Sequence, residues 1–494
     1  FSFALAIYCT SWAFYGVTAQ AAVNGWWIPP TYIGSLLLFW FGFGLIARIA
    51  IACRRYRITS VADFIATRYG HSRLLAVMTT LIVLMAVIPY IALQLQAVST
   101  SIDALVLTTP NSASAWHQDT GLYVSLWLAV FAMLFVGRSA KAHQPNPGLM
   151  SAIAFESLVK LLALLAVGSF VCFGLYDGIG DIFAKAAATP AVAQMQANAS
   201  STSVYWIHVL LGFIATLCLP RQFHVSFVEI QHLRHLRHAR WIFPFYLLLM
   251  SVFTLPVALA GVMLLGPSAN IDLVVLQLPL SANRTDMALL AYLGGFSAAT
   301  SMVIVATVVL GIMITNDLLT PLIYRQQQKP SDGKPLIKIA SLRRASMLAV
   351  LTLGYAYYRF IGTETGLAQL GLMAFALIAQ LAPALIIGLS SRRVNRQGAI
   401  AGLASGALIW AYMLLLPQLN RAGLLSWQWL SEGPFGLTYL APAELFYGQF
   451  DPISIGVVLS LTANVLMLLL VSQLSQTRFT EWLESARFLQ RPQQ

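Results

Sequence analysis

The chain has 494 residues, of which 59% are hydrophobic and only 9% are charged, and its formal net charge is +12. About a quarter of the residues in a typical soluble domain are charged, so this composition excludes a soluble fold and predicts that lipid surrounds the chain. In such a protein the positive charge belongs to loops beside the lipid bilayer, and no nucleic-acid partner is expected.

Apolar stretches long enough to cross a bilayer as helices recur along the whole chain. We predict twelve spans, at residues 2–22, 31–53, 72–106, 121–137, 150–177, 204–230, 241–266, 287–319, 345–360, 364–390, 397–416 and 452–475.

Basic residues are distributed unevenly between the loops on the two sides of the predicted spans. Placing alternate loops inside gathers most of the 29 Lys and Arg residues there, Arg221 among them, and leaves only Lys185, Arg284, Arg359 and Arg421 in the opposite loops. Because cytoplasmic loops collect Lys and Arg, the pattern predicts a multi-pass protein of the bacterial inner membrane with both visible ends in the cytoplasm.

Two of the predicted spans contain interruptions. Cys9, Thr10 and Ser11 form a polar group in the middle of the first span, where the helix either breaks or continues with its hydroxyls bonded to its own carbonyls. Pro220 lacks a backbone donor and must kink or stop the sixth span. Broken helices that each open a group of five spans are typical of inverted-repeat transporters, in which unwound backbone lines a binding site.

The fifth span carries charged and polar residues within an apolar stretch, namely Glu156, Ser157 and Lys160. A lysine well inside a span costs about 3 kcal/mol even on the lenient insertion scale, so Lys160 should face a cavity or a partner. Glu156 lies one helical turn away and could pair with it, which would make Lys160 structural. Alternatively, the Lys160 ammonium supplies charge near a cation site and coupling is proton-linked.

Four stretches of the chain resemble the sodium/solute symporter family over nearly its full length. They are YCTSWAFYG in the first span, ITSVADFIATRYG at 58–70, GGFSAATSMVIVATVVLGIMITND at 294–317 and LGLMAFALIAQLAPALIIGL at 370–389. The resemblance implies an all-α polytopic membrane protein with the LeuT-like inverted-repeat (5+5) fold. The repeats would be about 2–177 and 204–390, followed by extra helices at 397–475, with twelve visible spans of the usual thirteen.

A narrower resemblance concerns the CTSW and FESLVK segments and the polar tail. These are similar to the symporter-like membrane half of CbrA-type bacterial sensor histidine kinases. The resemblance implies that 1–475 form the membrane domain and that 476–494 form a cytoplasmic connector. Kinase domains attached to the same chain would then be partners.

The family resemblance also implies a sodium site between the break of the first span and the eighth span. The matching positions are the backbone carbonyls of Ala6 and Cys9 and the hydroxyls of Thr300 and Ser301, with Ser297 as the alternative hydroxyl. Hard cations prefer such oxygen ligands. The small residues on the eighth span could instead form a packing face between helices.

In the fifth span, Ser157 occupies the place of a carboxylate that many family members carry, so the coupling ion is expected to be Na⁺ or H⁺. Polar and aromatic side chains on the broken spans and their neighbours are candidates for solute binding. They are Tyr8, Ser11, Trp12, Gln94, Gln96, His208 and Gln369. Polar residues in spans also hold helices together, and Tyr8 and Trp12 are favoured because they flank the expected break.

No nucleophile triad, phosphate loop or pair of catalytic carboxylates is present, so we expect neither catalysis nor a cofactor within these 494 residues. His232, His235 and His238 alternate with arginines in an inside loop, which favours contact with anionic lipid over a metal site.

The sequence therefore predicts cation-coupled uptake or sensing of a small polar solute. The sensor-kinase resemblance implies an amino acid such as histidine. A non-transporting receptor domain that signals to the kinase, and a stand-alone sodium/solute symporter, are the alternatives.

Overall fold

The computed structural model describes residues 1–494 except 107–118, 137–145, 198–199, 267–269, 327–338, 361–366, 422, 424–431, 434–436, 438–439, 443–450, 478 and 490–494. Residue 137, residues 364–366 and parts of the predicted connector at 476–494 therefore lie outside the described residues. Within the residues described, every regular element is a helix.

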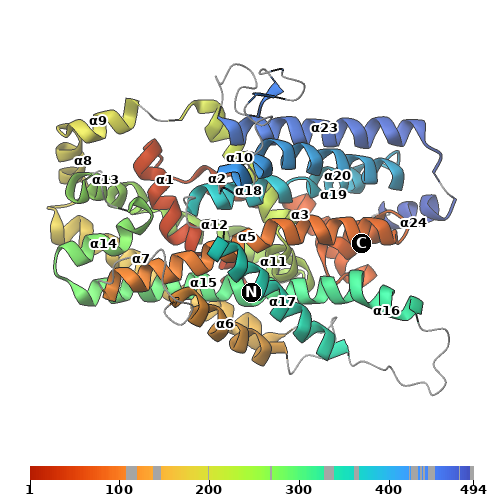
Figure 1. Cartoon of the computed structure of the whole chain (residues 1–494), viewed down its shortest axis with the longest axis horizontal. Helices are drawn as coiled ribbons and strands as arrows, with labels where there is room; N and C mark the ends of the chain where they lie inside the picture. The colour runs from red at the N-terminus through yellow and green to blue at the C-terminus, as the bar shows by residue number, and fades with distance from the viewer. Residues whose placement is uncertain are drawn as a thin grey trace.

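Long helices lie side by side along the longest axis of the molecule (Figure 1). They include α5 (Arg73–Val106), α7 (Pro147–Phe170), α15 (Thr285–Met313), α20 (Arg396–Trp410) and α23 (Pro452–Leu474). Short helices lie at both ends of this bundle. One end carries α8 (Ile179–Ala187), α9 (Pro190–Ala197) and α14 (Val274–Ser281), and the other carries α16 (Thr320–Gln326) and α24 (Phe479–Leu489).

The remaining α-helices connect or complete the bundle. They are α1 (Val17–Asn24), α2 (Pro30–Trp40), α3 (Phe43–Tyr56), α4 (Val61–Arg68), α6 (Thr120–Val136), α10 (Thr202–Cys218), α11 (Pro220–Phe223), α12 (Arg234–Ser251), α13 (Thr254–Leu265), α17 (Ile339–Phe360), α18 (Leu367–Ile378), α19 (Leu381–Ser390) and α21 (Leu416–Arg421). Segments of 3-10 or π geometry are η1 (Ala4–Tyr8), η2 (Trp12–Gly16), η4 (Val171–Leu175), η5 (His224–Val228), η6 (Ile271–Leu273), η7 (Ile314–Leu319) and η9 (Ala411–Leu415).

Side chains that precede several helices explain where those helices begin. Asn146, Asn395 and Asp451 each accept a hydrogen bond from a backbone N–H in the first turn of α7, α20 and α23, respectively. Ser60 does the same for α4, through Asp63 N at 3.1 Å. Such caps satisfy donors that the helix itself leaves free.

Helical residues coincide with each of the twelve predicted spans. By length and apolar composition, however, seven helices of the described part could cross a membrane, or nine if each of two bent pairs counts as one span. The difference has physical causes, because the first predicted span is divided into η1, η2 and α1, and α17 carries arginines near both ends. The count of twelve stays a prediction.

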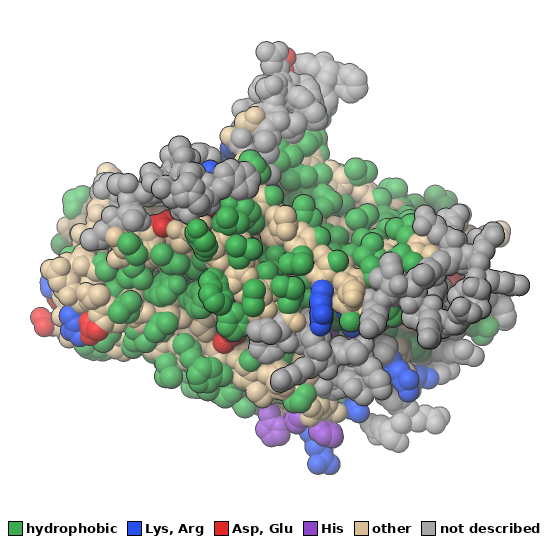
Figure 2. All heavy atoms as spheres, turned by 60° about the horizontal axis from the view of Figure 1, so that its bottom comes forward, with side chains coloured by type: hydrophobic (Ala, Val, Ile, Leu, Met, Phe, Trp, Pro, Cys, Tyr) green, Lys and Arg blue, Asp and Glu red, His purple; other side chains and the backbone are tan. Residues whose placement is uncertain are grey.

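Hydrophobic side chains cover most of the described surface on the face that Figure 2 shows, and charged side chains gather mainly at its left end and along its lower edge. Large apolar groups such as Phe155 (67% exposed) and Leu408 (70%) face outward, while Lys160 and Arg221 are buried. Soluble proteins expose charged side chains and bury large apolar ones, whereas here large apolar groups are exposed and two charged ones are buried. This distribution fits a polytopic membrane protein whose apolar surface contacts lipid.

Helices α2 and α10 cross in close backbone contact through a glycine on each. A Cβ atom built on Gly34 would lie 2.0 Å from Val209 O, and one built on Gly212 would lie 2.1 Å from Thr31 O. Because backbone atoms cannot move aside as a side-chain end can, only glycine fits at either position.

We expect Gly212→Ala to lower the thermal stability of the detergent-purified protein strongly, since overpacking costs about 1–3 kcal/mol and the clash here is with backbone. Gly44→Ala in α3 is the matched control, because its added Cβ would meet no atom within 4 Å. Unfolding followed by tryptophan fluorescence measures both variants. Equal melting temperatures for the two would contradict the tight α2–α10 crossing.

Candidate functional site

The first predicted span is interrupted at Cys9 and Thr10. The 3-10 turn η1 ends at Tyr8, Cys9 has an extended backbone (φ −81°, ψ 97°), and helical structure resumes at Ser11. All of these residues are buried. Buried backbone groups that lose their helical partners need other ones, so the surroundings of the break determine what it binds.

Helix α5 satisfies one side of this break. Gln94 Oε1 accepts hydrogen bonds from Ser11 N at 3.1 Å and from Ser11 Oγ at 2.7 Å. The hydroxyls of Thr10 and Tyr90 are 2.9 Å apart and share a hydrogen bond. Two side chains one turn apart on α5 therefore hold the unwound segment in place.

On its other side the break binds the ammonium of Lys160, which is fully buried on α7. Lys160 Nζ donates to Ala6 O at 2.8 Å and to Cys9 O at 2.6 Å. These are the two carbonyls that the family resemblance assigns to a sodium ion. The Lys160 ammonium therefore lies against the two carbonyls that would otherwise bind a sodium ion.

The alternative in which Lys160 pairs with Glu156 is not seen as a direct ion pair in this structure. The ion pairs within 4.0 Å among the described residues do not join the two side chains. Glu156 Oε1 instead accepts from Thr300 Oγ1 at 3.3 Å, and its backbone carbonyl accepts from Ser297 Oγ at 3.0 Å. Glu156 therefore joins α7 to α15, and Lys160 is left to the carbonyls.

The hydroxyl of Ser301, from the predicted cation site, and that of Ser157, a predicted coupling residue, bond to backbone. Ser301 Oγ donates to Ser297 O at 3.1 Å, and Ser157 Oγ donates to Ile153 O at 2.8 Å, both within their own helices. Among the described hydrogen bonds, none joins Thr300 or Ser301 to the carbonyls of Ala6 or Cys9.

The sixth predicted span is interrupted before Pro220. Helix α10 ends at Cys218, Leu219 leaves the helical region (φ −57°, ψ 126°), and Pro220 opens α11 with a bend of 52°. Proline suits the first turn of a helix because the missing donor has no partner there. Gln222 Nε2 donates to Leu5 O at 3.3 Å, so the two interruptions meet inside the protein.

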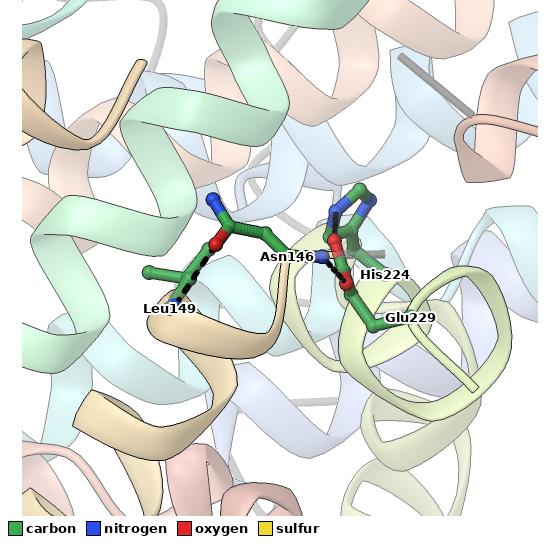
Figure 3. Close-up of polar contacts among 4 residues, drawn as sticks. All are labelled: Asn146, Leu149, His224 and Glu229. Atoms are coloured by element: carbon green, nitrogen blue, oxygen red, sulfur yellow. Dashed lines mark hydrogen bonds and ion pairs between the residues drawn. The ribbon is translucent and has the colours of Figure 1, made fainter. Parts of the chain in front are cut away.

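A buried polar bridge joins the segment after the second interruption to the start of α7 (Figure 3). His224 Nε2 lies 3.1 Å from Glu229 Oε1, and Asn146 N donates to Glu229 Oε2 at 2.7 Å. Asn146 also caps α7 through Leu149 N. These bonds link the segment after the second interruption to the helix that carries Lys160.

Aromatic rings surround the first interruption. Phe375 of α18 lies with its ring centroid 5.5 Å from that of Trp12, 6.3 Å from Tyr8 and 5.9 Å from Tyr90. The guanidinium carbon of Arg221 lies 4.6 Å from the Tyr90 ring centroid. We call Tyr8, Trp12, Tyr90 and Phe375 the aromatic cluster.

The structure corrects the expected position of Arg221. The distribution of basic residues predicts that Arg221 lies in an inside loop, yet it is 1% exposed, because Pro220 restarts the helix within the bundle and Arg221 follows directly. Sequence reasoning also missed Tyr90 and Phe375. For Arg221 the sequence offered one indication of burial, because this arginine follows a proline inside a predicted apolar span.

The predicted solute residues fall into two groups. Tyr8, Ser11, Trp12 and Gln94 meet at the first interruption. His208 packs edge-on against Trp26 at 5.5 Å, and Gln96 and Gln369 are half-buried with no described hydrogen bond to the interruption. The second group is therefore not brought to the site in this structure.

Comparisons with known proteins are consistent with this architecture. No protein-family model matches the chain. The sequence is 23% identical over 422 residues to an uncharacterized symporter, YhjB, of Bacillus subtilis (strain 168), covering 82% of this chain and 78% of that protein. The structure is similar to that of a Na⁺-coupled sialic acid symporter in a substrate-bound, outward-open state, with a TM-score of 0.67, 13% identity, and coverage of 96% of this chain and 90% of the other. The chain has the fold of that symporter, and its sequence is similar to that of a second symporter.

Proposed function

We propose that this protein carries a small polar solute, an amino acid such as histidine, across the bacterial inner membrane in symport with a cation. The contact of Lys160 Nζ with Ala6 O and Cys9 O carries the proposal, because it joins a buried cation to an interrupted helix. The symporter fold and the meeting of the two interruptions support it. The solute would bind against Tyr8 and Trp12, beside the segment that Ser11 and Gln94 hold in place.

The cation site of this proposal lies between η1, α7 and α15. Ala6 and Cys9 supply carbonyls, Thr300, Ser301 and Ser297 supply hydroxyls, and Glu156, Ser157 and Lys160 are the coupling residues. Hydrogen bonds from an ionised donor are about twice as strong as neutral ones, so loss of the Lys160 proton would weaken the link between α7 and the interruption. Coupling would then be to protons rather than to sodium.

Uptake of labelled histidine into vesicles reconstituted with the full chain tests this function. A pH gradient with the acid side outside should drive accumulation without sodium, whereas protein-free vesicles should show none. Accumulation driven only by a sodium gradient would indicate an ordinary sodium/solute symporter and would remove Lys160 as the coupling group. Absence of uptake under both gradients would refute symport.

A receptor function is the second candidate, and contacts at the end of the bundle that carries α24 support it. The Phe223 ring lies 5.7 Å from Phe64, and Phe64 lies 5.2 Å from Phe488 of α24. Rearrangement at Pro220 could thus reach the C-terminal segment and, through it, the domains of a sensor histidine kinase. Saturable histidine binding by purified protein, with no uptake under either gradient, would favour this function.

A further inference from the structure

Arg221 is buried without an acceptor for its charge. None of its three guanidinium nitrogens has a hydrogen-bond partner among the described residues, and no described carboxylate lies within 4.0 Å of it. Arg68, another buried arginine of the described part, is better satisfied. It donates to the carbonyls of Gly388 and Ser391. Among the described residues, Arg221 is the one arginine whose three nitrogens are all buried and without a hydrogen-bond partner.

Such a group needs an anion. Arginine does not lose its proton in proteins, so burial cannot be relieved by neutralisation. The face of the Tyr90 ring offsets part of the cost, but a ring face leaves the N–H donors without acceptors. The Tyr90 hydroxyl bonds to Thr10 and also interacts with Arg221, but a neutral hydroxyl does not neutralise the guanidinium charge. A buried charge without a partner is unfavourable, and an entering acceptor would be bound strongly.

The neighbouring groups indicate the chemistry of that acceptor. Trp12 Nε1 is a second buried donor without a partner, and Gln222 Oε1 is a buried acceptor without one. Tyr90, a member of the aromatic cluster, contacts both Phe375, with ring centroids 5.9 Å apart, and the Arg221 guanidinium. Unpartnered donors beside aromatic rings suit a small organic anion with a flat apolar part.

We propose that Arg221 binds the carboxylate of the solute, and that the aromatic cluster packs against the solute's flat side group. The solute class is therefore a small carboxylic acid, and a neutral amide of the same shape would be rejected. The inference rests on the proposed function only in placing the solute at this site. It does not depend on flux or on the coupling ion.

Binding to the full chain in lipid nanodiscs tests the preference for a carboxylate. Thermal stabilisation is measured with four carboxylates: L-histidine, L-phenylalanine, imidazole-4-acetate and benzoate. It is also measured with three amides: L-histidinamide, L-phenylalaninamide and benzamide. The buffer contains methanesulfonate, and a separate measurement with chloride tests whether a simple anion is sufficient. At least one carboxylate should stabilise saturably and bind about tenfold or more tightly than its amide, since the amide lacks the charge-assisted bonds. Stabilisation by no carboxylate, equal binding of acid and amide, or stabilisation fully explained by chloride would overturn the proposal.

Variants then assign the effect to Arg221. Arg221→Gln should weaken binding of the carboxylate by about 30-fold or more and leave amide binding unchanged, because it removes one partner of a buried charge pair. The carboxylate affinity of Arg221→Lys should lie between those of the parent and of Arg221→Gln, since lysine keeps the charge but lacks the planar pair of N–H donors. The control is Arg284→Gln, an exposed arginine paired with Asp286.

Unchanged carboxylate affinity in Arg221→Gln would overturn the assignment. If that variant does not fold, Arg221→Lys and the acid-to-amide ratio of the parent decide the question. The experiments distinguish failure of symport from failure of carboxylate binding by Arg221. If carboxylates bind but no uptake occurs, only symport is refuted. If a neutral solute is taken up and its binding does not depend on Arg221, only the role of Arg221 is refuted.

Discussion

Lys160→Gln is expected to abolish proton-driven uptake of labelled histidine, or to remove its pH dependence, while the protein still inserts and folds. The parent ammonium donates to Ala6 O and Cys9 O at 2.8 and 2.6 Å. Glutamine keeps a hydrogen-bond donor at this position but has no proton to exchange. The interruption of the first span would then be held in the same way at every pH.

The direction of the pH effect follows from where the proton binds and leaves. Low pH outside favours the protonated Lys160 amine, which closes the contact with the carbonyls. Higher pH inside favours release of the proton from Lys160. Uptake by the parent should therefore rise as the outer pH falls, and uptake by Lys160→Gln should not respond.

Two further variants make the measurement specific. Lys185→Gln is the control, because Lys185 lies on α8, is exposed, pairs with Asp181 at 2.6 Å and lies over the Tyr176 ring, away from the interruption. Lys160→Arg keeps a permanent charge, so it should bind solute but fail to complete the cycle. If Lys160→Gln instead transports with the parent's pH profile and requires sodium throughout, Lys160 does not couple transport.

Local sequence rules predicted the parts of the site that depend on single residues. Pro220 must end α10 because it lacks a donor, and Lys160 inside an apolar span must find a partner. Both features can be recognised without knowing the fold. Local rules alone do not identify the lysine's partner, because Ala6 and Cys9 are more than 150 positions away in the chain, and only the family resemblance indicated these carbonyls as a cation site near Lys160.

Features that depend on the packing of several distant segments could not be predicted from the sequence. Tyr90 and Phe375 look like ordinary apolar-span residues, and only packing of α5 and α18 against the interruption brings their rings together. Arg221 was assigned to a loop because charge near the end of an apolar stretch normally belongs there. The restart of the helix at Pro220 reverses that expectation.

Gln94→Leu is expected to lower both stability and uptake, because it removes the acceptor that fixes the interruption. Gln94 is fully buried and accepts from Ser11 N and Ser11 Oγ. Leucine would leave both donors buried without a partner, at a cost of about 1–3 kcal/mol each. The carbonyls of Ala6 and Cys9, which lie just before Ser11, would lose their fixed position relative to Lys160.

Gln96→Leu is the matched stability control for Gln94→Leu. It makes the same change two residues along α5, at a half-buried side chain whose Oε1 has no hydrogen-bond partner among the described residues. Melting temperature in detergent should therefore fall clearly for Gln94→Leu and little for Gln96→Leu. Because Gln94 holds backbone rather than solute, Gln94→Leu should weaken binding of carboxylates and of their amides by the same factor. A loss confined to carboxylates would contradict that role and would place Gln94 in direct contact with the acid group.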